Sequence, residues 1–199
     1  MIKLFAASLD ALAGREEMLL EQLPVGWVST WTAAHPTMHR TDSRVASLAG
    51  IWLAAQGGME GALRYDGNGK PHVDGVAISI THTTRYALCA ISDGEAPIGL
   101  DAEDMVGRLS EDRRLAMAER WFSADERAEA VKSEEAFYRI WTRKEAYVKR
   151  MGTGLRDLSA LDTASVTDCR FAEYRLEDTC ITLACAPDEC PPEKICMVE

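Results

Sequence analysis

The chain has 199 residues, of which 47% are hydrophobic, and its formal net charge is -10 at pH 7. This length allows one domain or two small ones, and the hydrophobic share is typical of a folded globular protein. The acidic charge argues against the broad basic surface that nucleic acid requires, and the short, interrupted apolar runs argue against a membrane span, so neither partner is expected.

The first half of the chain predicts a small unit of strands and helices. Residues 1–6 indicate a first strand rather than a signal peptide, because no long apolar stretch follows them, and a cytoplasmic location is expected. Residues 42–56 predict a helix, since apolar residues recur at helical spacing and Gly57 and Gly58 follow. The other elements expected here are a helix over residues 10–22 capped by Asp10, an irregular stretch over 25–40, a glycine-rich turn over 65–71, and strands over 76–81 and 86–92.

A tight connection at residues 93–97 is the predicted boundary between an N-terminal half, 1–95, and a C-terminal half, 96–199. In the second half, Ser123 followed by Glu126 predicts a capping box at a helix start. The expected elements are strands over 98–103, 169–176 and 179–186, and helices over 111–118, 124–131 and 134–150. Because both halves mix helices and strands without regular alternation, we expect an α+β fold.

Six cysteines raise the question of a zinc site, since all but Cys89 lie near the C-terminus. None belongs to a CxxC pair, and the ligand spacings of structural zinc sites are absent. Cys180 and Cys185 are five residues apart on a predicted strand, so they would point to opposite faces. We expect small, buried, reduced thiols instead.

Two acids stand on the strand predicted at 98–103. Asp101 and Glu103 differ by two positions, so they project to the same face of a strand. Neighbouring carboxylates repel each other unless a cation lies between them, and Mg²⁺ prefers oxygen ligands. The alternative is an exposed strand end with two solvated acids.

A charged group stands on the helix predicted at 134–150. Glu145 and Lys149 are four residues apart and share a helix face, with Lys144 beside them. The carboxylate could hold a metal while the lysine neutralises a phosphate. The alternative is an ordinary surface ion pair.

A histidine flanked by hydroxyl groups ends another predicted strand. His82 lies between Thr81 and Thr83, where it could donate to a phosphate, or it could be a satisfied histidine in a turn. Lys70, between Gly69 and Pro71, is by itself one exposed lysine in a turn.

Taken in order, these motifs resemble the 4'-phosphopantetheinyl transferase superfamily, in the larger type that activates surfactin synthetase. The resemblance covers about residues 44–155, with a looser match in the final strands. Its most specific parts are the Gly-x-Asp-x-Glu strand at 99–103 and the helix segment at 141–149. The full series is Gly69-Lys70-Pro71, Ile80-Thr81-His82-Thr83, Ile98–Glu103, Arg120-Trp121-Phe122-Ser123 with Glu126, Trp141–Lys149, and Gly152-Thr153-Gly154-Leu155.

The resemblance implies a pseudo-dimer of two similar α+β halves, each a small, mostly antiparallel sheet with helices, and coenzyme A as co-substrate. The residues that it assigns to Mg²⁺ are Asp101, Glu103 and Glu145. The residues that it assigns to coenzyme A are Arg44, Lys70, Thr81, His82, Lys144 and Lys149. It also matches Glu126 to an acidic family position without indicating its role.

Two departures from the commonest family pattern leave the predicted metal ligands intact. Thr81 and Thr83 replace serines but keep both hydroxyls, and Ala102 replaces a bulkier apolar residue between the two acids. These changes leave open which carrier proteins the chain accepts.

The implied activity is transfer of 4'-phosphopantetheine from coenzyme A to a serine of an acyl or peptidyl carrier protein, with Glu145 as the base and Lys149 offsetting charge on the transferred group. One alternative is another Mg-dependent phosphate-ester enzyme, although the chain has no GxxxxGK[ST] phosphate loop. The other is a non-catalytic module that binds carrier proteins. A monomer is expected. Arg113, Met117 and Arg120 share one helix face, which is either a carrier-docking patch or a plain solvated helix face.

Overall fold

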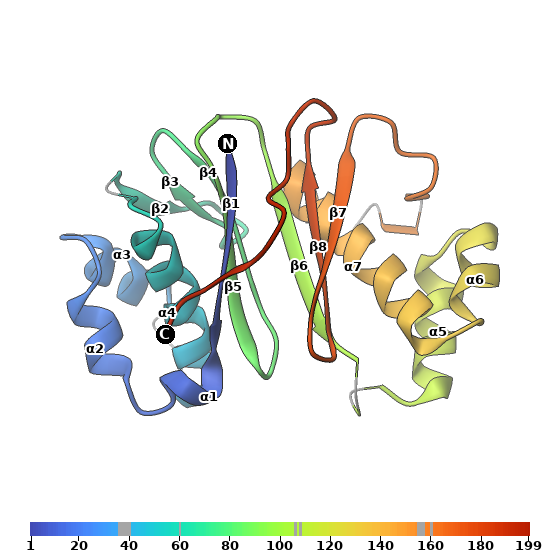
Figure 1. The fold of residues 1–199 in the computed structure, drawn as a ribbon, viewed down its shortest axis with the longest axis horizontal. Helices are drawn as coiled ribbons and strands as arrows, with labels where there is room; N and C mark the ends of the chain where they lie inside the picture. The colour runs from blue at the N-terminus through green and yellow to red at the C-terminus, as the bar shows by residue number, and fades with distance from the viewer. Residues whose placement is uncertain (36–40, 60, 106, 108, 155–157, 160) are drawn as a thin grey trace. The chain divides into compact units, whose positions relative to one another are not determined.

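The computed structural model describes the chain except residues 36–40, 60, 106, 108, 155–157 and 160, and the side chains of residues 41–43 (Figure 1). The chain forms two compact units. Unit 1 consists of Met1–Ala96 and Cys190–Glu199, and unit 2 consists of Pro97–Glu189. Both contain helices and sheets, so the α+β class is confirmed. Of the helices described, none is both long and apolar enough to cross a membrane.

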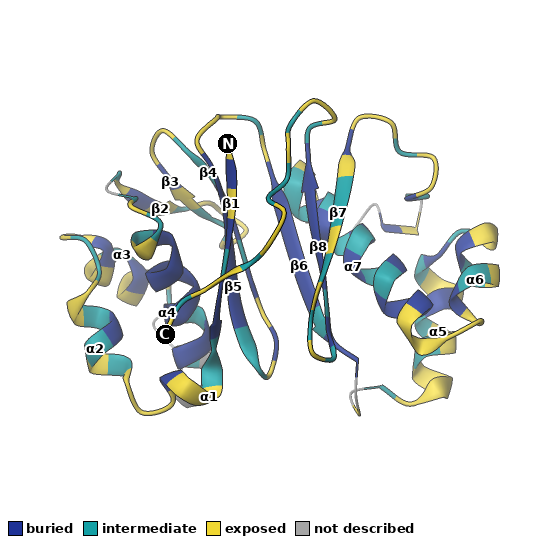
Figure 2. Ribbon diagram, viewed as in Figure 1, coloured by how far each residue is buried: buried dark blue, intermediate teal, exposed yellow. Residues whose placement is uncertain are grey.

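Unit 1 is built on a four-stranded sheet and a small hairpin. The sheet has the order β4 (Ala77–His82), β5 (Tyr86–Ser92), β1 (Ile2–Ser8), β9 (Cys196–Met197), and it is antiparallel except where β9 runs parallel to β1. The hairpin joins β2 (Leu63–Tyr65) to β3 (Pro71–Val73) through the predicted glycine-rich turn. Figure 2 shows that the inner strand β5 is buried over most of its length.

The helices of unit 1 are α1 (Leu9–Leu12), α2 (Glu16–Glu21), α3 (Trp27–Ala34) and α4 (Thr41–Gln56). Three tryptophans, Trp27, Trp31 and Trp52, are at most 2% exposed and form much of the core that α4 shares with the sheet. Each indole N–H is satisfied by a hydrogen-bond acceptor, as burial of a tryptophan requires.

Two predictions for unit 1 are wrong. The single helix expected over 10–22 is divided, because Gly14 adopts a left-handed φ of +73° that ends α1, and Ser8 rather than Asp10 caps α1. The stretch expected to be irregular contains α3, whose Trp27 and Trp31 are four residues apart and turn to the same core.

Unit 2 contains a three-stranded antiparallel sheet. Its order is β6 (Gly99–Asp104), β8 (Thr179–Cys185), β7 (Arg170–Leu176). The helices are α5 (Glu111–Trp121), α6 (Ala124–Ala130) and α7 (Glu134–Met151), and α7 packs against β6 and β8. The capping box of Ser123 and Glu126 at the start of α6 is confirmed.

The two units share part of their element order. Each begins with a strand, continues through helices of which the last is long, and later adds a hairpin to its main sheet, β4–β5 or β7–β8, while unit 1 also contains the β2–β3 hairpin and β9. In each, the second strand of that hairpin pairs with the opening strand: β5 with β1, and β8 with β6. The long helices α4 and α7 each pack on the strands of their own unit.

The last ten residues differ from the expected second half, 96–199, because they belong to unit 1. There β9 completes the free edge of β1, and the Val198 amide donates to the Ala6 carbonyl at 2.8 Å. The cysteines also differ in part from expectation. Cys89, Cys169 and Cys185 are buried, whereas Cys180 is half-buried and Cys190 and Cys196 are exposed.

Candidate active site

The predicted acids of β6 face α7 because Gly99 lets the strand come close to the helix. A Cβ atom at Gly99 would lie 1.9 Å from the Ala146 carbonyl oxygen and 2.5 Å from the Arg150 nitrogen. Any other residue would therefore push β6 away from α7. Asp101 and Glu103 follow Gly99 at the two-residue period of a strand, so they share its face.

Asp101 and Lys149 form a charged contact across this face. The Lys149 ammonium lies 2.7 Å from Asp101 Oδ1, within hydrogen-bond distance. The Asp101 side chain is 7% exposed and that of Lys149 is 31% exposed. The pair is therefore shielded at the carboxylate and open to solvent at the lysine.

Trp141 supports the second acid. Its indole N–H donates to Glu103 Oε1 at 3.3 Å from the first half of α7. Trp141, Glu145 and Lys149 follow at intervals of four residues, so they lie along one face of α7. The strand acids and the helix charges thus meet along one interface within unit 2.

The environment of Glu145 changes its ionisation strongly. Burial first, and then the negative charges of Asp101 and Glu103, raise its pKa from 4.5 to about 7 against the opposing effect of the Lys149 ammonium. Electrostatic coupling to all three neighbours places four charged side chains in one site. A carboxyl group with a pKa near 7 can exchange a proton at neutral pH.

The predicted ligand residues of unit 1 lie on two of its features. Thr81 is buried near the end of β4, and His82, the last residue of that strand, is exposed. Thr83 accepts hydrogen bonds from the Arg85 and Tyr86 amides through Oγ1, at 3.0 and 3.1 Å, and so fixes the turn after His82. Lys70 lies in the hairpin turn, where its amide donates to Asp66 at 2.9 Å.

Arg44 lies on α4 and makes two contacts inside unit 1. Its Nε is 2.5 Å from Glu16 Oε1, and its guanidinium group lies 4.6 Å from the ring centroid of Trp31. These contacts hold the arginine against α2 and α3. The predicted roles of Arg44, Lys70, Thr81 and His82 in ligand binding stay predictions.

Residues 97–190, which comprise unit 2 and one further residue, match the family model of the 4'-phosphopantetheinyl transferase superfamily. Over these residues the chain is similar to that superfamily. The resemblance drawn from the sequence motifs is confirmed, including its surfactin-synthetase-activating type, by similarity to relatives of that type.

Three relatives show how far the similarity extends. The chain is 33% identical over 121 residues to 4'-phosphopantetheinyl transferase psf-1 of Bacillus pumilus, covering 57% of this chain and 49% of the relative. It is 28% identical over 149 residues to Sfp of Bacillus subtilis, covering 64% and 62%. It is 29% identical over 181 residues to AcpT of Salmonella typhimurium, covering 83% and 92%. The chain thus spans about half the length of psf-1 and nearly all of AcpT.

Within residues 97–190, three acidic side chains suit the Mg²⁺ that the sequence motifs imply. Asp101, Glu103 and Glu145 supply carboxylate oxygens, the ligand type that Mg²⁺ prefers. Burial, and after it the repulsion from Asp101 and Glu103, raises the pKa of Glu145, and a bound cation would offset that repulsion. Among the described residues, no three His, Cys, Asp or Glu side chains already form a metal-binding group. The three acids would have to draw together, so their role as ligands stays a prediction.

Lys144 differs from its predicted role in ligand binding. Its side chain is 0% exposed, and its ammonium lies 2.9 Å from Glu126 Oε2. It also donates to the carbonyl oxygens of Leu158, at 3.1 Å, and of Leu161. Three acceptors match the three hydrogens of an ammonium group. Lys144 thus has no exposed surface from which to reach a phosphate.

Glu126, whose role the sequence left open, is the partner that holds Lys144. One carboxylate oxygen accepts hydrogen bonds from the Thr163 amide and hydroxyl at 2.9 and 2.8 Å, and the other accepts from the Ser123 amide at 2.9 Å. Glu126, the second residue of the capping box of α6, therefore connects α6 to α7 and to the segment around Thr163. The Lys144–Glu126 pair therefore has a structural role, since it links these elements.

Sequence reasoning missed two residues that shape the site. Gly99 was part of the quoted motif, but only the structure shows that its missing side chain sets the approach of β6 to α7. Trp141 was quoted only as the first residue of the helix motif, whereas its indole N–H donates to Glu103. Its four-residue spacing from Glu145 was the available signal.

Proposed function

We propose that this protein transfers the 4'-phosphopantetheine group of coenzyme A to a serine of an acyl or peptidyl carrier protein, releasing 3',5'-ADP. The observation that carries the proposal is Glu145, whose pKa of about 7 arises at an interface with Asp101, Glu103 and Lys149 in the superfamily region. Relatives named 4'-phosphopantetheinyl transferases support the same activity.

Three carboxylates would hold the metal. Asp101 and Glu103 would bind it from β6, with Glu103 oriented by Trp141, and Glu145 would bind it from α7. When bound, Mg²⁺ supplies positive charge that neutralises the pyrophosphate of coenzyme A. The close packing of β6 on α7 at Gly99 would bring the two strand ligands near the helix ligand.

The chain's own residues would then move one proton and balance charge. Glu145 would accept the proton of the carrier serine, directly or through a water molecule. The serine oxygen forms a bond to the β-phosphorus while the bond between that phosphorus and the bridging oxygen breaks, and 3',5'-ADP leaves with that oxygen. Lys149, one helical turn after Glu145, would offset the charge on the transferred phosphoryl group.

Unit 1 would hold the nucleotide part of coenzyme A. Arg44 and Lys70 supply positive charge, and Thr81 and His82 supply donors at the end of β4. We extend the proposal to a pseudo-dimer of two similar halves. What supports this is the shared order of elements and the shared pairing of β1 with β5 and of β6 with β8.

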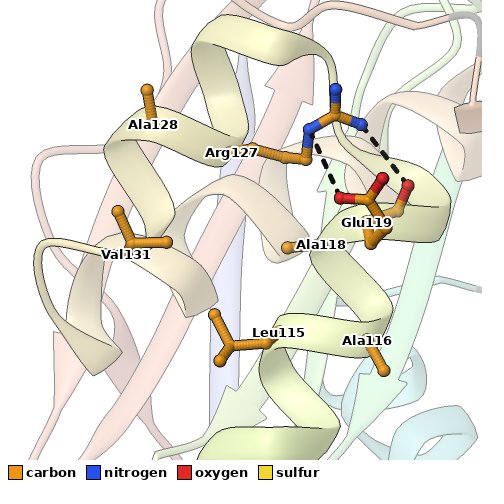
Figure 3. A pocket seen from close by; sticks show the side chains of 7 residues that line it. All are labelled: Leu115, Ala116, Ala118, Glu119, Arg127, Ala128 and Val131. Carbon is orange, nitrogen blue, oxygen red and sulfur yellow. Dashed lines mark hydrogen bonds and ion pairs between the residues drawn. The ribbon is translucent and has the colours of Figure 1, made fainter.

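The proposed docking patch for the carrier protein lies on α5. This helix extends to Trp121, so Arg113, Met117 and Arg120 all belong to it, as the patch requires. Met117 is half-buried against the core, Arg113 is exposed, and Arg120 stacks 4.6 Å from the Trp121 ring centroid. A separate apolar hollow of about 550 Å³ lies between α5 and α6, lined by Leu115, Ala118 and Val131 among others (Figure 3).

A transfer assay tests the proposal directly. The purified protein is incubated with coenzyme A, Mg²⁺ and an apo carrier protein, and the carrier is weighed by mass spectrometry. We expect a mass increase of one phosphopantetheine group, with equimolar 3',5'-ADP. The increase should be absent with EDTA, and absent when the carrier serine is replaced by alanine.

The same assay separates the two alternatives. Cleavage of coenzyme A without a carrier protein would favour another phosphate-ester enzyme. Carrier binding with no Mg²⁺-dependent binding of coenzyme A would favour a non-catalytic module. Either result, repeated with both acyl and peptidyl carriers, would contradict the proposed transfer.

A further inference from the structure

Lys149 holds a position that a metal would need. Its ammonium is 2.7 Å from Asp101 Oδ1, and Asp101 is one of the residues that would hold the proposed metal. A divalent cation and an ammonium group repel each other, so a cation held by Asp101 would weaken the contact of Lys149 with that carboxylate. Lys149 is thus the counter-ion of Asp101 in the metal-free protein.

The surroundings explain why a counter-ion is needed there. The Asp101 side chain is only 7% exposed, so water screens its charge poorly. The carboxylates of Glu103 and Glu145 add like charge to the same interface. A lysine from the facing helix reduces this excess of negative charge until another cation arrives.

The Lys149 side chain is also able to move away from Asp101. Its side chain is 31% exposed, and four flexible methylene groups carry the ammonium. It lies in the last turn of α7, which ends at Gly152 in a left-handed conformation with φ of 69°. A phosphate oxygen of the ligand would be an acceptor for an ammonium released from Asp101 there.

We propose that Lys149 is an exchangeable internal counter-ion, whose ammonium moves from Asp101 to a phosphate of coenzyme A when a divalent cation takes its place. The inference rests on the proposed function for the identity of the phosphate ligand. Exchange couples the two binding events, because each ligand removes a cost of binding the other. By linkage, the metal and coenzyme A strengthen each other's binding by the same factor.

Metal binding without coenzyme A tests the first step. Mn²⁺ binding is followed by the electron paramagnetic resonance signal of free Mn²⁺, for wild type, Lys149→Met and Arg143→Met. Arg143 also lies on α7 but pairs with Glu173 at 2.5 Å, so it controls for loss of one positive charge. We expect Lys149→Met to bind Mn²⁺ about tenfold more tightly than wild type, and Arg143→Met to match wild type. Binding by Lys149→Met that is no tighter than by wild type would overturn the inference.

Chemical labelling of the amine tests the exchange itself. Lys149 is acetylated in the wild-type protein, and its modification is quantified by mass spectrometry relative to Lys132, whose side chain is 67% exposed. Mg²⁺ alone should increase labelling of Lys149, and subsequent addition of coenzyme A should decrease it. Unchanged labelling under saturating Mg²⁺ would refute the exchange.

The outcomes distinguish this inference from the proposed function. Unchanged labelling in a protein that does modify a carrier would remove the exchange alone. Tighter Mn²⁺ binding by Lys149→Met and Mg²⁺-dependent labelling, in a protein that modifies no carrier, would remove the proposed transfer and retain the exchange of Lys149 for the cation. Absence of metal binding in every state would overturn both.

Discussion

Lys144 and Glu126 form an ion pair in which the two side chains are 0% and 4% exposed, with 2.9 Å between Nζ and Oε2. Both charged groups are buried away from water. Hydrogen bonds from Thr163 and Ser123 to the Glu126 carboxylate replace some of its bonds to water. Removal of one partner leaves a buried charge without compensation, which costs more than removal of both. The pair joins α6 and α7, so we expect its loss to destabilise the fold.

The first prediction follows from this pair. Lys144→Met should lower the free energy of unfolding by about 3–5 kcal/mol, because Glu126 stays buried without its cation. Urea unfolding followed by circular dichroism measures the loss. Lys132→Met is the control, since Lys132 pairs with Glu129 on the surface and its loss should change the midpoint little. Equal midpoints for the two variants would contradict a structural role for the buried pair.

The second prediction concerns the packing of β6 on α7. Gly99→Ala places a Cβ atom 1.9 Å from the Ala146 carbonyl oxygen, so strand and helix must separate. We expect a loss of about 1–3 kcal/mol in the free energy of unfolding, together with weaker Mn²⁺ binding, because Asp101 and Glu145 move apart. Gly67→Ala is the control, since nothing lies within 4 Å of its Cβ position. Unchanged metal binding by Gly99→Ala would show that the strand–helix distance does not set the site.

The third prediction is a pH dependence of stability. Burial, and then the charge of Asp101, raise the pKa of Glu145 from 4.5 to about 7 in the metal-free protein. The native state keeps this proton to higher pH than the unfolded chain does, so stability falls as the pH rises from about 4.5 to about 7. Glu145→Gln removes the charge and should raise the free energy of unfolding by about 2–3 kcal/mol at pH 8, but little at pH 4.

Urea unfolding in EDTA at the two pH values measures this effect. Glu135→Gln is the matched control, because Glu135 lies near the start of α7, has a side chain that is 64% exposed, and pairs with Arg175. It should show no such difference between pH 4 and pH 8. An equal gain for Glu145→Gln at both pH values would mean that Glu145 is not protonated at neutral pH in the metal-free protein.

The fourth prediction tests the metal assignment. Asp101→Ala should reduce carrier modification by on the order of 10² or more and abolish Mn²⁺ binding, while the fold changes little. Lys149 tolerates the loss because its side chain is 31% exposed and can be solvated. Asp104→Asn on the same strand is the control, because Asp104 faces the other way and accepts a hydrogen bond from Thr179 at 2.6 Å. Normal transfer by folded Asp101→Ala would rule out Asp101 as a metal ligand.

Periodicity made part of the site predictable. Asp101 and Glu103 share a face because strands repeat every two residues, and Glu145 and Lys149 share one because helices nearly repeat every four. The same reasoning could not orient Lys144. Its neighbour Glu145 faces the acids of β6, and only the tertiary contact with Glu126 determines that Lys144 turns inward.

The fold was predictable where the signals were local. The strands at 86–92 and the capping box at Ser123 follow from residues close in the chain. The two-residue strand β9 forms by pairing with the edge of β1, which is distant in sequence, so no local pattern predicts it. Gly14 divides the first predicted helix through a backbone conformation that an apolar period does not reveal.

The last prediction concerns the carrier protein. This chain has a net charge of -10, and an acidic carrier would be repelled at long range, so recognition should depend on a local patch. Met117 and Arg113 lie four residues apart on α5, and they supply apolar surface and positive charge. Met117→Glu should therefore raise the apparent KM for the carrier protein several-fold and leave that for coenzyme A nearly unchanged.

The matched control lies on another face of the same helix. Leu115 is 45% exposed and lines the hollow between α5 and α6 (Figure 3). Leu115→Glu adds the same charge to α5 and should leave the KM for the carrier unchanged. Because Met117 also packs on the core, the midpoint of urea unfolding is measured for both variants, and KM is compared under conditions where both are folded. An unchanged carrier KM for Met117→Glu with a raised one for Leu115→Glu would move the docking surface to the hollow, because the added charge weakens binding only where the carrier contacts α5.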